Sequence, residues 1–219
     1  MHKKLITACM AMAAFAAFAV TSVASASPVL THKGTVVPVG EKIIGTLEPG
    51  TVSTFVSSLG TVTCTESTLT GTVRTNSGTH IAGDIESAMW GSEGESETKC
   101  TSWLGLVKPT PTGLPWCLTS GTKDTFTVRG GKCSEAAKAL SFTLDFPSFS
   151  CGYERAASSP IAGTFTTATE GSTLKIAEQE FPRVHGGFGC PSSGKLNMAF
   201  YMYTDTGDEH IAANRLGIS

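Results

Sequence analysis

Apolar and polar residues alternate along much of the chain after residue 26. In 195–203, every second residue from Leu196 to Met202 is apolar, and 141–146 and 69–75 follow the same period. A period of two places successive side chains on opposite faces of a β-strand, and a single apolar face is typical of an antiparallel sheet that covers a core. The residues that this pattern places in the core are Phe142, Leu144, Phe146, Leu196, Met198, Phe200, Val62 and Val73.

Further short segments rich in Thr, Val and Ile, which favour strands, lie between turn residues. These segments are 36–39, 43–47, 52–57, 60–64, 80–87, 125–129, 161–167 and 173–177. Their spacing predicts an all-β fold, an antiparallel β-sandwich or barrel with about ten or more strands. One short helix is expected at 134–140, where Ser134 can cap the first turn. The proline-rich segment 106–115 is predicted to be a crossover, because proline removes a hydrogen-bond donor from a strand interior.

The chain after the first 26 residues is expected to form a single disulfide-stapled β domain, 27–219, with candidate halves 27–107 and 114–219. A degenerate internal duplication would explain two matching segments. A strand ending at Cys64 precedes Gly-Thr-Val-Arg-Thr, and a strand ending at Cys151 precedes Gly-Thr-Phe-Thr-Thr. Such matches arise easily in a threonine-rich chain, so chance similarity is the alternative.

Six cysteines follow the first 26 residues, and six cysteines allow 15 pairings. If the chain is duplicated, each copy is closed by its own bridge, which leaves the two central cysteines to pair. The predicted bridges are therefore Cys64 with Cys100, Cys117 with Cys133, and Cys151 with Cys190.

The first 26 residues have the three parts of a secretory signal peptide. Lys3 and Lys4 supply positive charge, residues 5–20 are apolar, and 24–26 is a small-residue cleavage site before Ser27. This predicts a secreted, extracellular protein without a membrane span, in a compartment where cysteines oxidise.

Two other interpretations of this segment are weaker. Cys9 stands in a lipoprotein-like box, but the apolar run continues past it. As a membrane anchor, the apolar run is shorter than the roughly 20 residues that a spanning helix needs.

Charge gives no indication of a nucleic-acid partner. Loss of Lys3 and Lys4 with the signal takes the Lys and Arg count from 16 to 14 against 18 acidic residues, a formal net charge of −4. The densest basic cluster is 129–132, too small for a phosphate-binding surface.

Catalytic motifs are largely missing from the sequence. It contains no Gly-x-Ser-x-Gly elbow, no His-Glu-x-x-His and no phosphate-binding glycine loop, so no catalytic residue and no cofactor is predicted. The histidines after the signal stand singly, at 32, 80, 185 and 210.

Glu93, Glu95 and Glu97 are weak candidates for a metal site. In a strand these alternate carboxylates would face one side and could supply part of a calcium shell. The alternative, favoured by the intervening Gly and Ser, is a solvated acidic loop. The glycine-rich segment 185–190 is interpreted as a long hairpin loop.

Exposed aromatic side chains are the best candidates for binding. Tyr201 and Tyr203 lie opposite the apolar face of 195–203 and are expected to be exposed, and Trp90 borders the acidic loop. Trp116 and Trp103, which lie close to cysteines, are expected to pack in the core.

These features resemble a loose group of uncharacterised, secreted, disulfide-containing all-β proteins of actinobacterial type. The resemblance rests on the signal peptide, Gly-Thr-Val-Thr-Cys at 60–64, Leu-Pro-Trp at 114–116 and the late cysteine pair, and covers roughly 45–204. It implies a compartment and a fold, and it carries over no catalytic residue.

Two functional classes follow from the sequence. One is a non-catalytic extracellular module that binds envelope glycan or protein through a sheet face. The alternative is a secreted hydrolase whose site is assembled only in three dimensions. A pocket with a histidine near a serine or carboxylate would favour the enzyme, and a flat aromatic surface would favour binding.

Overall fold

The computed structural model describes residues 28–92, 98–168, 171–205 and 214–219. These residues form an all-β fold, as the alternation predicted. The strands are β1 (Leu30–His32), β2 (Thr35–Val36), β3 (Lys42–Leu47), β4 (Ser53–Ser57), β5 (Gly60–Cys64), β6 (Glu66–Asn76), β7 (Ile81–Gly91), β8 (Cys100–Ser102), β9 (Gly105–Thr112), β10 (Trp116–Ser120), β11 (Thr125–Gly130), β12 (Leu140–Asp145), β13 (Ser150–Arg155), β14 (Ile161–Ala168), β15 (Gly171–His185), β16 (Ser193–Thr204) and β17 (Leu216–Ile218).

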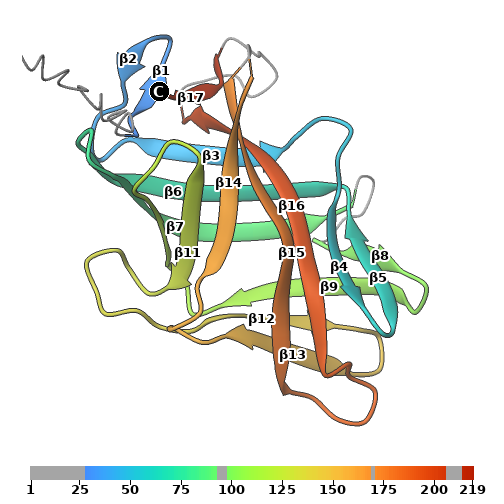
Figure 1. Cartoon of the computed structure of the whole chain (residues 1–219). Coiled ribbons are helices and arrows are strands. Elements are labelled where there is room, and N and C mark those ends of the chain that lie inside the picture. The colour runs from blue at the N-terminus through green and yellow to red at the C-terminus, as the bar shows by residue number, and fades with distance from the viewer. Residues whose placement is uncertain (1–27, 93–97, 169–170, 206–213) are drawn as a thin grey trace, which may run out of the picture.

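Two long strands, β15 and β16, run through the middle of the barrel and pair with each other (Figure 1). Their hairpin belongs to two closed rings of antiparallel pairings. One ring runs from β16 through β3, β6, β7, β10, β11 and β14 back to β15. The other runs from β16 through β4, β5, β8, β9, β12 and β13 back to β15. A small sheet, β17-β1-β2, lies at one end of the first ring.

A bulge in β15 separates the two rings. The register with β16 shifts between Ile176 and Gln179, and Glu178 has a φ of 51°. The Glu178 N–H donates to Oδ1 of Asn197 at 2.8 Å. Before the bulge β15 pairs with β14, and after it with β13. Because a bulge bends its strand and increases the local twist, it lets one strand serve both rings.

The core follows the predicted apolar faces. Phe142, Leu144, Met198, Phe200, Val62 and Val73 are buried, while Phe146 and Leu196 are half-buried and pack against the core. Phe55 and Phe142 both contact Tyr153 and each other, and Phe142 also contacts Phe181, with ring centroids 4.7–5.8 Å apart in these four contacts. Burial raises the pKa of Tyr153 to about 12.

All three predicted disulfides are confirmed, with Sγ–Sγ distances of 2.02, 2.08 and 2.00 Å. They indicate an oxidising environment. The internal duplication stays a hypothesis. Cys64 and Cys100 lie on neighbouring strands β5 and β8, whereas Cys151 lies in β13 and bonds Cys190 in the loop between β15 and β16.

The predicted crossover was wrong for most of its length, because 105–112 forms strand β9. Its prolines Pro109 and Pro111 pair with β12. Strand β8 pairs with β9 only at 105–107. Beyond residue 107, the edge of β9 that faces away from β12 pairs with no strand. A proline whose nitrogen faces that edge removes no hydrogen bond of the sheet.

The predicted helix at 134–140 was also wrong. Cys133 is bonded to Cys117 in β10, and Gly130 bridges Lys138. Nη2 of Arg129 donates to the carbonyl oxygens of Lys132, Cys133 and Glu135 at 3.0–3.4 Å. These carbonyls are therefore satisfied without helical hydrogen bonds.

No helix within the described ranges has the length and hydrophobicity needed to cross a membrane.

Candidate functional site

Tyr201 and Tyr203 are buried, so the prediction of an exposed tyrosine face was wrong. They are 8% and 2% exposed. The Tyr201 hydroxyl donates to Glu48, and the Arg215 guanidinium lies 3.6 Å from the Tyr201 ring centroid. Arg215 also donates from Nε to the Tyr203 hydroxyl at 3.1 Å. The C-terminal segment with β17 packs over this face of β16, which makes both tyrosines structural.

Trp90 is also buried, at 8% exposed, and packs 6.3 Å from Trp116 between ring centroids. The cause is a bulge in β7. Thr70 in β6 pairs with Ser87 and the next residue pairs with Ile85, so Glu86 is the extra residue. The bulge reverses the alternation along β7 and turns Trp90 toward the core.

Glu93, Glu95, Glu97 and His210 lie outside the described residues, so the acidic metal candidates stay untested. His32 has a buried Nε2 without a hydrogen-bond partner, and Nδ1 of His80 contacts only the neighbouring Thr79 hydroxyl. Among the described hydrogen bonds, none joins a histidine to a serine or a carboxylate.

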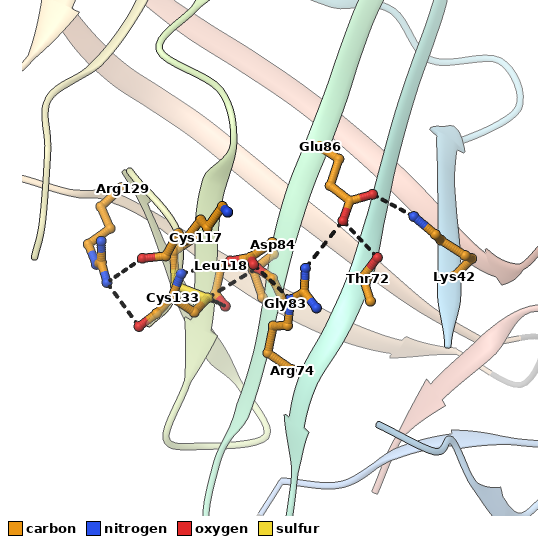
Figure 2. Close-up of polar contacts among 11 residues, drawn as sticks. Lys42, Thr72, Arg74, Gly83, Asp84, Glu86, Cys117, Leu118, Arg129 and Cys133 are labelled. Atoms are coloured by element: carbon orange, nitrogen blue, oxygen red, sulfur yellow. Dashed lines mark hydrogen bonds and ion pairs between the residues drawn. A yellow bond between two sulfur atoms is a disulfide. The ribbon is translucent and has the colours of Figure 1, made fainter. Parts of the chain in front are cut away.

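A network of charged side chains crosses strands β3, β6 and β7 on the outside of the barrel (Figure 2). Asp84 is its buried member, with a side chain 4% exposed. Its Oδ2 accepts from Nε of Arg74 at 2.7 Å, and its Oδ1 accepts from the backbone N–H of Cys133 at 2.7 Å. Asp84 therefore holds the loop that follows β11 against the barrel.

Bulges supply two of the four charged groups of this network. Arg74 is the extra residue where the β6 register shifts between Val73 and Thr75, and Glu86 is the extra residue of β7. Glu86 accepts from Thr72 at 2.9 Å and pairs with Lys42 at 2.6 Å and with Arg74 at 3.4 Å. The Lys42 hydrogen bond, followed by that from Thr72, holds the pKa of Glu86 below its usual 4.5.

Acid should weaken this part of the network. The folded-state pKa of Glu86 lies below the unfolded value, so its stabilisation is present above pH 4.5 and is lost as the pH falls through the folded pKa. We expect Glu86→Gln to lose less stability than the wild type as the pH falls below 4.5. Urea unfolding at each pH measures this, and parallel curves for the two proteins would contradict it.

The carboxylate of Asp84 and the sulfurs of Cys117 and Cys133 lie within 4.8 Å of one another. The two sulfurs are joined in a disulfide, so neither is a thiolate that could bind a metal ion. The arrangement is structural.

Trp103 is the exposed tryptophan, contrary to the prediction that it packs in the core. It lies in the turn between β8 and β9 and is 71% exposed. Its Nε1–H donates to the carbonyl oxygen of Leu59, in the turn between β4 and β5. A Cβ atom at Gly60 would lie 2.9 Å from Cδ1 of the indole, so glycine at this position allows the ring to approach. The ring is therefore held in place although most of it is exposed.

Other aromatic residues lie in turns at the same end of the barrel (Figure 1, lower right). Phe146 and Phe149, in the turn between β12 and β13, stack with centroids 4.6 Å apart. A Cβ at Gly105 would contact Pro147 of this turn at 3.5 Å, and one at Gly189 would contact the Phe149 ring at 3.8 Å. The turn that holds Trp103 therefore lies close to the turn between β12 and β13, and that turn lies close to the loop between β15 and β16.

That loop presents Phe188, which is fully exposed. Nη1 of Arg183 donates to the carbonyl oxygens of Gly187 at 3.2 Å and Cys190 at 2.6 Å, and the bridge from Cys190 to Cys151 fixes the end of the loop. We call the set Trp103, Phe146, Phe149 and Phe188 the aromatic tip surface. No motif marks it in the sequence, since its members come from three separate turns.

A row of threonines lies on the strands next to the turn that holds Trp103. Thr54, Thr63 and Thr101 form a row across β4, β5 and β8, on the face opposite the buried side chains of these strands. Trp103 follows Thr101 by two residues, in the turn just beyond the end of β8.

The sequence matches no family model and no curated protein, and the fold matches no solved structure.

Proposed function

We propose that this protein is a secreted, non-catalytic module that binds an extracellular glycan at the aromatic tip surface, with Trp103 as the main contact. The observation that supports this most is the state of Trp103, which is 71% exposed but fixed by its bond to Leu59 and its contact with Gly60. A side chain already fixed before binding loses little conformational entropy when a ligand arrives.

The chemistry around Trp103 suits a saccharide. One face of a pyranose ring carries mainly C–H bonds and packs on an aromatic ring, while its hydroxyls need hydrogen-bond partners. Trp103 offers an aromatic surface whose only polar atom is already bonded, and Thr63 and Thr101 lie on the adjoining strands. The four aromatic side chains of this surface carry no charge, which suits an uncharged ligand.

Trp103→Ala should weaken glycan binding about tenfold or more, because an aromatic contact contributes on the order of 1.5 kcal/mol beyond the area that it buries. The probes are insoluble peptidoglycan, chitin and cellulose in sedimentation assays, and soluble oligosaccharides from whichever of these retains the protein. Trp103→Phe should keep part of the affinity. Met89→Ala is the matched control, because Met89 is a large exposed side chain on β7.

Tryptophan fluorescence gives a direct second measurement. Trp90 and Trp116 are 8% and 5% exposed, so acrylamide should quench mainly Trp103. A bound oligosaccharide should protect Trp103 from the quencher. The proposal is wrong if none of these glycans retains the wild type, or if folded Trp103→Ala binds them as well as the wild type does.

A further inference from the structure

The interior of the barrel contains two apolar cavities, apart from the aromatic tip surface. The first, of about 70 Å³, lies between the two rings, and residues of both rings line it, among them Phe55, Trp90, Trp116 and Phe142. The second, of about 90 Å³, lies inside the first ring. Leu30 of β1 and Ile218 of β17 also line the second cavity, so the small sheet closes that end of the ring.

The two cavities are neighbours. Five side chains line both, which leaves a single layer of side chains between them: Leu69, Ile85, Leu118, Leu174 and Phe200. Most of these are aliphatic and can change rotamer without losing a hydrogen bond.

Several polar residues that border the cavities are bonded elsewhere, whereas Nε1 of Trp90, beside the first cavity, is buried without a hydrogen-bond partner. Ser53 accepts a hydrogen bond from Ser67 at 3.2 Å beside the first cavity. Beside the second, Thr72 donates to Glu86, and both carboxylate oxygens of Asp84 are bonded on the outside of the barrel. The walls therefore offer a water molecule few of the two to four partners that it needs.

We propose that the barrel interior is a binding site for one slender apolar group, an alkyl chain, which passes from the second cavity into the first by displacing the shared side chains. Apolar cavities of about 150 Å³ stay dry and take up hydrocarbons such as benzene, and the two cavities together reach this size. The ring of β3, β6, β7, β10, β11, β14, β15 and β16 has the strand number at which a barrel can hold one small ligand.

The test uses n-hexane and benzene as probes and the methyl NMR signals of the protein as the readout. Both hydrocarbons should shift the signals of Leu69, Ile85 and Leu174 and raise the melting temperature. Leu174→Phe places a larger side chain between the cavities and should weaken hexane binding at least tenfold. Leu174→Met, which keeps the volume, is the matched control and should bind like the wild type.

Two further variants make the result decisive. If Leu174→Phe does not fold, Ile85→Phe fills the same wall from β7 and should have the same effect. Trp103→Ala should bind hexane normally, which separates this site from the glycan surface. The proposal is overturned if hexane leaves the methyl signals of the wild type unchanged, or if a folded Phe variant binds hexane as well as the wild type.

Discussion

Replacing Cys151 and Cys190 together with serine should lower the free energy of unfolding by about 4 kcal/mol. The bridge spans 39 residues, and the chain-entropy relation for a loop of this length gives about that value. The bridge also fixes the loop that presents Phe188. Urea unfolding monitored by circular dichroism measures the change.

The Cys117–Cys133 bridge provides a graded comparison. It spans 16 residues, so its removal should cost about 3 kcal/mol by the same relation. Peptide mapping without reduction confirms that the remaining bridges are unchanged in each variant. If the variant without the Cys151–Cys190 bridge unfolds at the same urea concentration as the wild type, the bridge does not stabilise the fold.

Much of the fold could be predicted because the signal is local. The alternation in 195–203 and 141–146 marks two strands and most of their buried residues, and the internal match between the two halves suggested the three bridges. Strand β9 was missed because whether a proline is tolerated depends on which edge of a strand is paired. That edge is set by β8 and β12, far from it along the chain.

The site could not be predicted, because exposure depends on distant segments and on single inserted residues. Tyr201 lies on a face that would be exposed in an isolated sheet, but Arg215 covers it. Trp90 turns inward because Glu86 adds one residue to β7. Trp103 lies close to a cysteine in the sequence, yet it is in a turn, and its ring contacts Gly60 of another hairpin. The exposure of each of these side chains can be predicted only when the segment that packs against it is known.

Asp84→Ala should lower the free energy of unfolding by about 3 kcal/mol, although Asp84 lies outside the hydrophobic core. The substitution leaves the backbone N–H of the half-buried Cys133 without its acceptor, and it removes the partner of Arg74. An unsatisfied buried donor costs about 1–3 kcal/mol, and loss of a charged partner adds to this. Because the Arg74 side chain is 45% exposed, water can solvate its charge. The expected loss of stability therefore lies near the lower end of the range of about 3–5 kcal/mol for breaking a buried ion pair.

Glu86→Ala is the matched control, since Glu86 belongs to the same network but its side chain is 35% exposed. Ion pairs of that exposure contribute about 1 kcal/mol or less. Asp84→Asn should fall between the two, because its amide oxygen can still accept from Cys133 while the charge opposite Arg74 is lost. Urea unfolding of the three variants at neutral pH ranks them. Equal losses for Asp84→Ala and Glu86→Ala would show that burial of Asp84 and its bond to Cys133 do not determine the stability of this region.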